Sequence, residues 1–476
     1  MSESAVEASD ESHVVTAFLR HRGEVLLCRR SDAVSTYAGS WGGVSGFAEG
    51  DPDEQVRVEI REETGLEDDE IAVVRSGRPI AFEDPDLERE WVVHPYLFDC
   101  EDRTAIELSE EHDEFAWVPP TAIVASESGV DSEWGNRETV PKLWTAYERV
   151  APTVRSIAAD GDHGAAYLSV RALEVLRDRA GLLVAEREES GVDPDAEWDE
   201  LAELAERLLE ARPAMGVLRN RVNRAMADAV RAGRSDATET ATGDEIGDAP
   251  TVLAAAISGI ERAVTADDEA AANAGARIDG TVLTLSRSGT VLDALRRGSP
   301  SRVFVAESRP AREGVAVAEA LSDDPEVDCP VTLHTDAAAA HVLAREDIER
   351  VLVGADTVRP DGSVVNKTGT RGVAAAASLE GVPVTVVAAT DKVSTRAEES
   401  LESGDRSAVY DGDASIDVVN PTFDVTPANY VTELVTERGV LEPGAIEPVV
   451  EELYALESWH GGVETETTDR NHSVDN

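Results

Sequence analysis

The sequence predicts an α/β protein in which two strand-containing regions flank a helical segment. Before residue 150, short apolar strands surround a single helix. From 151 to 280, apolar residues recur at three- and four-residue spacing, which is typical of helices. After residue 280, β-branched runs alternate with helical stretches, and this pattern indicates a parallel sheet with helices on both faces. We therefore expect domains at 1–150, 151–280 and 281–460, and a disordered polar tail at 461–476.

The N-terminal region has the signals of a small sheet that carries one helix. A hairpin turn is predicted at residues 21–23 and a glycine-rich turn at residues 41–49. The helix is expected to begin at Pro52 and to end at Gly65, because proline is favoured in the first helical turn and glycine just after the last. The predicted strands are residues 14–19, 24–28, 91–98 and 114–118.

Three carboxylates lie on one face of this predicted helix, because Glu59, Glu62 and Glu63 are spaced at i, i+3 and i+4. Carboxylates this close repel one another unless a cation lies between them. Mg²⁺ prefers oxygen ligands of this kind, usually shared with the phosphates of a substrate. The alternative is a solvated acidic face, which is common in a chain of this composition.

The chain is strongly acidic, with 43 Lys and Arg residues against 96 Asp and Glu residues and a net charge of −53. Its 42% hydrophobic residues predict folded domains, not a disordered acidic chain. Concentrated salt screens such a charge, so we expect a halophilic, cytoplasmic protein that loses stability when desalted. The charge argues against nucleic-acid binding, and no apolar run is long enough to predict a membrane span.

Lysine and cysteine usage adds two observations. Only Lys142, Lys367 and Lys392 are lysines, and every other Lys or Arg position holds arginine. A compact ammonium differs from a guanidinium at a tight phosphate site, so the two lysines near predicted strands of the C-terminal region support a phosphate ligand. The three cysteines lack the spacing of a metal site and suit reduced thiols.

Residues 351–372 organise the C-terminal region. A predicted buried strand at 351–353 is followed by Asp356, and Asn366 and Lys367 come before a glycine-flanked helix. Open α/β sheets bind ligands at the carboxyl ends of their strands. An acid, an amide and an ammonium in this position predict a site for a small phosphorylated ligand. A turn-capping aspartate and a solvated lysine are the alternative.

Two weaker phosphate-binding signals come earlier in the chain. The turn at residues 286–290 leads from a strand directly into a helix, where amides and hydroxyls bind anions. Arg212 stands before a helix expected to start at Ala214, after Pro213. Common strand-turn-helix segments and surface arginines are the alternatives. The predicted helices of the middle segment are 164–177, 197–210, 214–231 and 252–265, with a mobile loop at 233–248. The predicted C-terminal strands are 281–285, 302–306, 331–334, 351–353 and 384–388.

Residues 41–66, WGGVSGFAEGDPDEQVRVEIREETGL, resemble the signature of Nudix pyrophosphohydrolases, and the resemblance covers about residues 12–150. It implies an α/β/α sandwich in which Glu59, Glu62 and Glu63 bind Mg²⁺, with Glu49 in support and Glu62 also catalytic. It further implies hydrolysis of a nucleoside diphosphate linked to another group, with the metal clamping the diphosphate and activating water.

Two positions depart from the Nudix pattern. Val58 replaces the arginine that precedes the first helix glutamate, and Arg57 and Arg61 are the candidates to substitute for it. The Gly-Glu pair before the helix is inverted, as Glu49-Gly50. The fold is expected to be kept, and the hydrolase activity is the property that these departures affect.

Several ordered motifs in the rest of the chain resemble the initiation factor 2B alpha/beta/delta family, which includes ribose-1,5-bisphosphate and methylthioribose-1-phosphate isomerases. The motifs are LTLSRSGTVLDAL, VFVAESRPAREG, VLVGADTVRPDGSVVNKTGT, AATDKV and NPTFDVTPANYVTELVTERGVL. The resemblance covers about residues 155–455. It implies a helical subdomain, a Rossmann-like sheet domain and a homo-oligomer formed through the C-terminal domain.

This second resemblance places a catalytic carboxylate on Asp356. It places the phosphate and sugar contacts on Arg212, Ser288, Gly289, Thr290, Asn366, Lys367 and Lys392. The isomerases pair a cysteine with the aspartate, but Ser286 stands at that position. A thiol exchanges a proton near neutral pH, whereas a serine needs a strong neighbouring base. The family's Arg-Gly-Ala contact reads His163-Gly164-Ala165 here. Ligand binding is therefore expected to be retained and isomerisation to be impaired or altered.

The sequence thus predicts a two-module enzyme. A Mg²⁺-dependent Nudix pyrophosphohydrolase is joined to an initiation-factor-2B-like domain that binds a sugar phosphate or a nucleotide. The alternative is a non-catalytic regulatory or translation-initiation subunit with a vestigial Nudix module. The retained phosphate contacts favour the enzyme, whereas Ser286 and Val58 favour the subunit.

Overall fold

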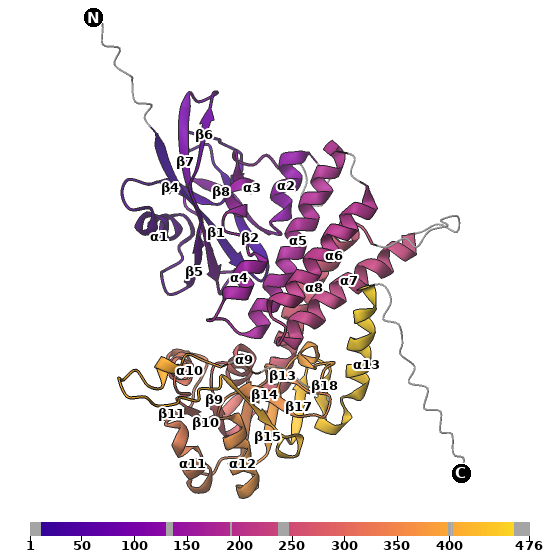
Figure 1. Ribbon diagram of the computed structural model, residues 1–476. Helices are drawn as coiled ribbons and strands as arrows, with labels where there is room; N and C mark the ends of the chain where they lie inside the picture. Colours follow the sequence, from indigo (N-terminus) through magenta and orange to yellow (C-terminus); the bar gives the residue numbers. More distant parts are fainter. Residues whose placement is uncertain are drawn as a thin grey trace, which may run out of the picture. The chain divides into compact units, whose positions relative to one another are not determined.

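The computed structural model (Figure 1) describes residues 11–129, 137–190, 193–236, 247–397, 401 and 403–460. Contacts within the chain divide it into two units. Unit 1 comprises Met1–Asp160, Val170–Leu204 and Asp248–Glu261, and unit 2 comprises Gly161–Ser169, Ala205–Gly247 and Arg262–Asn476. The boundaries expected at residues 150 and 280 stay predictions, and the expected tail at 461–476 lies outside the described residues.

Unit 1 is built on an eight-stranded sheet. Its strands are β1 (Ser12–His21), β2 (Glu24–Arg30), β3 (Trp41–Gly42), β4 (Val44–Phe47), β5 (Ile71–Ser76), β6 (Ile80–Asp84), β7 (Arg89–Cys100) and β8 (His112–Val118). The order is β3-β2-β1-β7-β5, while β4 pairs with β1, β6 with β7 and β8 with β2. The predicted hairpin is confirmed, because Arg22 and Gly23 have the positive φ angles (50° and 88°) that a two-residue turn between β1 and β2 requires.

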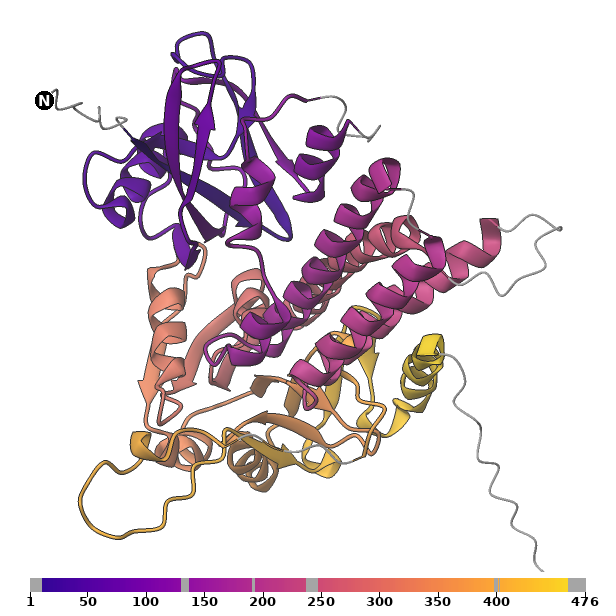
Figure 2. The same cartoon turned by 45° about the horizontal axis from the view of Figure 1, so that its top comes forward.

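Helix α1 (Pro52–Thr64) confirms the predicted helix and its limits. The Asp51 side chain caps its start by accepting a hydrogen bond from the Asp53 amide (3.0 Å), and Gly65 ends it with a φ of 76°. One hydrophobic core joins α1 to one face of the sheet. A second core joins α2 (Thr121–Ser128) and α3 (Leu143–Glu148) to the other face. Figure 2 shows the ribbon of this unit in indigo and purple, with helices on both sides of the sheet. These layers confirm the α/β/α sandwich.

The middle of the chain is helical, as predicted. After α4 (Val154–Ala159) come α5 (Ala165–Ser190), α6 (Pro194–Ala211), α7 (Gly216–Asp236) and α8 (Ala249–Gly275). Two details of the prediction were wrong. Helix α7 begins at Gly216, after a turn in which the Met215 amide donates a hydrogen bond to the Arg212 carbonyl (3.0 Å). The predicted loop also began too early, because α7 continues through Gly233; one glycine costs about 1 kcal/mol in a helix and does not end it. Residues 237–246 of that loop lie outside the described residues.

Unit 2 contains a seven-stranded sheet in the order β11-β10-β9-β12-β15-β17-β18. The strands are β9 (Asp279–Leu285), β10 (Ser299–Ala306), β11 (Val331–His334), β12 (Arg350–Gly354), β15 (Val384–Val387), β17 (Glu433–Thr436) and β18 (Gly439–Leu441). All pairs are parallel except β17 with β18, so the predicted parallel sheet is confirmed. The chain adds β10 and β11 on one side of β9 and then β12 and β15 on the other. The strand order therefore reverses at β9, the place where open α/β sheets bind ligands.

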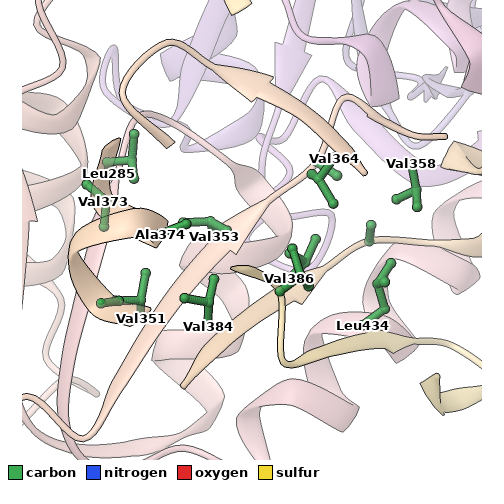
Figure 3. Packing of buried hydrophobic residues seen from close by; sticks show 14 of the residues in the cluster. Leu285, Val351, Val353, Val358, Val364, Val373, Ala374, Val384, Val386 and Leu434 are labelled. Carbon is green, nitrogen blue, oxygen red and sulfur yellow. The ribbon is translucent and has the colours of Figure 1, made fainter. Parts of the chain in front are cut away.

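Helices cover both faces of this sheet. They are α9 (Gly289–Arg297), α10 (Glu313–Asp323), α11 (Ala339–Arg345), α12 (Thr370–Glu380) and α13 (Glu447–Ala455). Alternate strand residues enter two cores: Val351 and Val353 pack with α11, α12 and α13, whereas Leu352 packs with α8, α9 and α10. Figure 3 shows part of the first core, with Val353 beside Ala374 of α12.

A three-stranded antiparallel sheet in unit 2 was not predicted. It consists of β13 (Thr357–Val358), β14 (Val364–Lys367) and β16 (Phe423–Thr426), in the order β13-β14-β16. Strands this short carry little alternation in the sequence. The 3₁₀ helices are η1 (Asp336–Ala338), η2 (Thr390–Lys392), η3 (Arg406–Ala408), η4 (Ala428–Tyr430), η5 (Pro443–Ala445) and η6 (Leu456–His460). Among the described residues, no helix combines the length and the apolar character needed to cross a membrane.

Candidate functional sites

The acidic face of α1 forms the first candidate site. Glu63 is buried, Glu59 is half-buried, and Glu62 and Glu49 are exposed. Glu63 Oε2 accepts a hydrogen bond from the Ser45 amide (3.1 Å), and Glu59 Oε1 accepts one from the Gln55 side chain (2.7 Å).

The glycine-rich turn explains how these carboxylates approach the sheet. A Cβ atom on Gly46 would lie only 2.0 Å from the Glu59 carboxyl carbon. A side chain at this position would therefore displace the Glu59 carboxylate from its place beside β4. The sequence showed the glycines, but only the tertiary structure shows which side chain needs the space.

The acidic cluster has an unbalanced charge. Burial raises the pKa of Glu63 to about 8 and also raises the pKa of Glu59. Glu63 Oε1 has no hydrogen-bond partner among the described residues. The nearest imidazole does not supply the charge, because burial lowers the pKa of His112 to about 4 and its Nε2 lies 3.9 Å from Glu63 Oε2. A bound cation would balance the cluster.

These residues fit a magnesium ion. Their donors are all carboxylate oxygens, which Mg²⁺ prefers, and one buried oxygen of Glu63 has no partner in the described protein. Among the described residues, no three His, Cys, Asp or Glu side chains already have the arrangement of a metal site. Shared coordination is expected for this ion, because Mg²⁺ usually takes only one or two protein carboxylates together with substrate phosphates and water.

A cavity of about 510 Å³ opens beside the acidic cluster in unit 1. Glu49, Glu59 and Glu62 line it, together with the cationic side chains of Arg30 and Lys142. The sequence did not assign Lys142 to a site; its rarity was the signal available.

An aromatic wall faces part of this cavity. Phe47 and Trp91 are stacked with ring centroids 6.1 Å apart, and the Arg89 guanidinium lies 5.0 Å from the Trp91 ring centre. The lining also includes Tyr37 and Phe82. The cavity thus combines an apolar surface that suits a flat ring with cations that suit phosphate groups.

The two arginines considered as substitutes at Val58 are occupied elsewhere. Arg57 pairs with Asp68 (3.3 Å), and Arg61 pairs with Glu67 (2.8 Å) and Asp68 (3.3 Å). These pairs bind both guanidinium groups to the loop that follows α1.

The second candidate site lies in unit 2, where the strand order reverses. Ser286 directly follows β9, and its amide donates a hydrogen bond to Ser308 Oγ (2.7 Å). Its hydroxyl donates to Glu313 Oε2 (2.9 Å), and Lys367 Nζ lies 3.0 Å from Glu313 Oε1. The sequence did not identify Glu313, because one acid among many carries no local signal.

The turn after Ser286 meets the end of β12. A Cβ atom on Gly354 would lie 2.6 Å from Ser288 Oγ, so the two segments touch. Ser288 caps α9, with its hydroxyl 3.4 Å from the Val291 amide, and Gly289 and Thr290 form the first turn of that helix. Asp356 follows β12 two residues after Gly354, and its amide donates to the Val365 carbonyl (3.0 Å). The structure thus brings the 286–290 turn next to the strand end that precedes Asp356.

Lys392 is the most unusual residue of this site. It is 6% exposed and lies in η2, after β15. The adjacent Asp391 does not balance it, because that carboxylate pairs with Arg221 (3.4 Å) and Arg224 (3.1 Å). An anionic ligand would compensate the positive charge of this nearly buried lysine.

The other residues predicted for the second site differ in burial and in their contacts. Asn366 is buried and donates to Thr370 Oγ1 (3.0 Å). Arg212 is half-buried in the bend after α6, where its carbonyl accepts from the Met215 amide (3.0 Å). His163 stacks on Tyr167 with ring centroids 4.1 Å apart. The Asp162 carbonyl beside it accepts from Arg287 (2.8 Å), which brings this loop to the 286–290 turn.

A second residue that the sequence missed is Asp424. Its carboxylate accepts hydrogen bonds from the amides of Gly369 (2.8 Å) and Arg371 (3.1 Å). Burial raises the pKa of Asp424. The first amides of α12 are therefore already occupied by a carboxylate, and the glycines before this helix serve that contact.

Comparison with known proteins agrees with both halves of this description. The model of the initiation factor 2 subunit family matches residues 161–443, more than half of the 476 residues. The chain belongs to this family. The model of the NUDIX domain matches residues 11–142, so unit 1 contains a domain of that type. Both resemblances predicted from the motifs are confirmed.

The curated relatives match the second part of the chain. A ribose 1,5-bisphosphate isomerase of Haloferax volcanii is 34% identical over 324 residues, covering 64% of this chain and 94% of the relative. A protein of the same name from Haloterrigena turkmenica is 32% identical over 329 residues, with the same coverage. Among solved structures, the Pyrococcus horikoshii translation initiation factor eIF-2B aligns with a TM-score of 0.49 and 25% identity, covering 61% of this chain and 95% of that one.

Proposed function

We propose that the protein is a two-module enzyme of phosphorylated-sugar metabolism. The Nudix domain hydrolyses a diphosphate, and the second module binds a sugar phosphate or a nucleotide. The observation that carries the proposal is that each candidate site holds a nearly buried ionisable side chain: Glu63, which has one oxygen without a hydrogen-bond partner among the described residues, and Lys392, which is 6% exposed. Glu63 calls for a cation and Lys392 for an anion, and a Mg²⁺-diphosphate and a sugar phosphate supply these charges.

In the first module, Glu59, Glu62 and Glu63 would hold Mg²⁺, with Glu49 in support. When bound, the ion clamps the diphosphate and lowers the pKa of a water molecule. Arg30 and Lys142 in the cavity lining neutralise the phosphates, and the Phe47–Trp91 wall orients a flat substituent. Hydrolysis joins the water oxygen to one phosphorus, breaks the P–O–P bond and transfers the water proton to a base, for which we propose Glu62.

In the second module, Lys392 and the 288–290 turn bind the phosphate of the ligand. The turn supplies the amides and the hydroxyl at the start of α9, a nine-residue helix whose dipole favours an anion there. Asp356 lies at the end of the neighbouring strand β12 and is the proposed proton-transfer group. Arg212 and Asn366 complete the proposed set of ligand contacts.

The hydrolase proposal is tested by turnover of a panel of nucleoside diphosphate derivatives in concentrated salt with Mg²⁺. The full chain should release a monophosphate product, and Glu62→Gln should lower the rate at least 10²-fold. Glu54→Gln, an acid-to-amide change in the first turn of the same helix, is the matched control and should retain the wild-type rate. Equal turnover by wild type and Glu62→Gln would sink the proposal.

A second candidate function is a non-catalytic regulatory or translation-initiation subunit that keeps the fold and the ligand site. Ser286 favours it, because this hydroxyl replaces the thiol of the related isomerases. Binding of ribose 1,5-bisphosphate without any conversion, together with no hydrolysis in the first module, would support this second function.

We also propose that the protein is cytoplasmic, halophilic and a homo-oligomer formed through the C-terminal domain. The net charge of −53 supports the halophilic part, because self-repulsion needs screening by concentrated salt. Thermal unfolding measured at falling salt concentration tests this part, and the melting temperature should fall with the salt. Light scattering of the full chain in concentrated salt gives the oligomeric state.

A further inference from the structure

Glu313 stands where two neighbouring strand ends meet in unit 2. It is the first residue of α10, after the turn that follows β10. Strands β10 and β9 are parallel neighbours with Ala306 opposite Leu285, so the turn after β10 comes back to Ser286. The Glu313 side chain is 22% exposed and Lys367 is 27% exposed, so both are accessible to a small molecule.

Each oxygen of the Glu313 carboxylate accepts one hydrogen bond. Ser286 Oγ donates to Oε2 at 2.9 Å, and Lys367 Nζ donates to Oε1 at 3.0 Å. A carboxylate has about four lone-pair positions, so each oxygen keeps one position for a proton. Two donors, one directly after β9 and one at the end of β14, orient the carboxylate and leave it able to accept a proton.

The backbone around this carboxylate is held in a conformation that non-glycine residues rarely adopt. Ser286, Ser308 and Arg312 have φ angles of 62°, 62° and 59°. Ser308 links two of these turns, because its hydroxyl accepts from the Ser286 amide (2.7 Å) and its own amide donates to Asp336 (2.8 Å). Strained backbone persists where the surroundings over-determine it, and it clusters at functional sites.

We propose that Glu313 is the proton acceptor and donor of the second site, with Ser286 and Lys367 as its positioning residues. The inference rests on the proposed binding of a sugar phosphate in unit 2. A serine hydroxyl is too weak a base for this role, whereas a carboxylate one hydrogen bond away is a competent one. The Ser286–Glu313–Lys367 arrangement thus supplies the base that a serine at this position lacks.

The reaction is an aldose-to-ketose isomerisation of a ribose phosphorylated at C1. Glu313 takes the proton from C2, its electron pair forms the C1=C2 bond, and the ring C1–O bond breaks as Asp356 gives its proton to that oxygen. Asp356 then recovers the proton of the C2 hydroxyl, C2 becomes a carbonyl, and Glu313 returns its proton to C1. Both carboxyl groups end as they began, and no further reactant is needed.

This assignment changes the role of Lys367. Its ammonium is paired with Glu313 and serves the base, so phosphate binding falls to Lys392 and the 288–290 turn. The sugar carbon that loses its proton is expected beside Glu313, with the phosphate on the side of Lys392.

The experiment uses the full chain in concentrated salt with ribose 1,5-bisphosphate. Binding is measured by calorimetry, and conversion is measured in heavy water, where deuterium entering C1 of the product reports proton exchange. Glu313→Gln should lower kcat by about 10²-fold or more, the range of general base catalysis, with the dissociation constant within about threefold of wild type. Glu319→Gln, in the exposed part of the same helix, is the matched control.

Two further variants separate a base from a structural acid. Glu313→Asp keeps the carboxylate and should recover part of the turnover. Lys367→Met removes the neighbouring positive charge, so the acid limb of the kcat–pH profile should move to higher pH. Both can be measured even if Glu313→Gln does not fold, and an unmoved acid limb would count against the proposal.

The outcomes distinguish this inference from the proposed function. Three results would overturn the role of Glu313 while ligand binding stands. The wild type could bind the ligand without converting it, only Ser286→Cys could convert it, or Glu313→Gln could turn it over at the wild-type rate. Absence of binding by wild type would overturn the proposed function itself, and the role of Glu313 with it.

Discussion

In unit 1 the buried Glu63 carboxylate has an oxygen without a hydrogen-bond partner among the described residues, whereas in unit 2 Lys392 is 6% exposed and its neighbour Asp391 is already paired with Arg221 and Arg224. The two sites thus hold side chains of opposite charge type. The Nudix site has negative charge to neutralise, and the second site has positive charge. A Mg²⁺ ion and a phosphate group are the complementary ligands.

Buried charges elsewhere in unit 1 are paired. Glu174 is fully buried, with Oε2 lying 3.3 Å from Arg20 Nη1 and Oε1 lying 3.1 Å from Arg171 Nη2. Arg20 also binds Asp99 (2.7 Å). The comparison teaches that the buried Glu174 carboxylate lies beside two guanidinium groups, whereas the buried Glu63 carboxylate has only an imidazole of lowered pKa nearby.

The largest loss of folding stability is expected when the buried, ion-paired Glu174 carboxylate is removed. Glu174→Leu removes a fully buried carboxylate that pairs with Arg20 and Arg171 and leaves Asp99 to compensate both guanidinium groups, so it should cost about 3 kcal/mol. Thermal unfolding of the full chain should show this loss in the transition of unit 1. Glu200→Leu, which breaks an exposed pair with Arg179, is the control and should cost under about 1 kcal/mol. Equal losses would show that burial does not set the cost.

Removing the Glu63 carboxylate should impair hydrolysis without a large loss of stability. Glu63→Gln lowers hydrolysis at least about 10²-fold, because a metal ligand and its charge are lost. Without metal, the variant should melt close to the wild-type temperature, since the raised pKa of about 8 keeps Glu63 mostly protonated near neutral pH. Hydrolysis with Mg²⁺ and melting with a chelator measure the two properties. A large loss of metal-free stability would contradict the comparison.

Removing the Lys392 ammonium sharpens the comparison in unit 2. Lys392→Met should weaken binding of ribose 1,5-bisphosphate about 10- to 100-fold, the value of a hydrogen bond to a charged group. The melting temperature of the ligand-free variant should stay equal or rise. Arg224→Met removes a cation that pairs with Asp391 (3.1 Å) and Glu452 (3.3 Å), so it should lower the melting temperature. Calorimetry and thermal unfolding are the measurements, and unchanged affinity in Lys392→Met would exclude its phosphate role.

The smallest effect is expected at a partly exposed pair. Hydrogen bonds from Arg438 lower the pKa of Glu452 to about 2. A lowered pKa adds stability above the unfolded-state pKa of about 4.3, and this is lost as the pH falls toward 2. Glu452→Gln should therefore reduce stability at pH 7 by under about 1 kcal/mol, because the pair is exposed. Melting curves of wild type and Glu452→Gln are compared at pH 7 and at pH 3, and the stability difference between the two proteins should be smaller at pH 3. An equal difference at both pH values would contradict the lowered pKa of Glu452.

Much of the fold follows from local patterns. Pro52 and Gly65 mark α1 because each residue suits one end of a helix, and the helical repeat places Glu59, Glu62 and Glu63 on one side. Alternating β-branched runs and helices predicted the parallel sheet of unit 2, because parallel strands need crossover helices between them. The short strands β13 and β14 escaped detection because two to four residues show no clear period.

The sequence by itself determined the elements, the acidic face of α1 and the rarity of lysine. Only the tertiary structure decided which charges meet a partner. Glu313 reaches Ser286 because β9 and β10 are neighbours, Glu174 reaches Arg20 across 154 positions, and Lys392 is only 6% exposed. Secondary structure depends on near neighbours in the chain. The environment of a charge depends on distant segments that the fold brings together, and no local pattern encodes them.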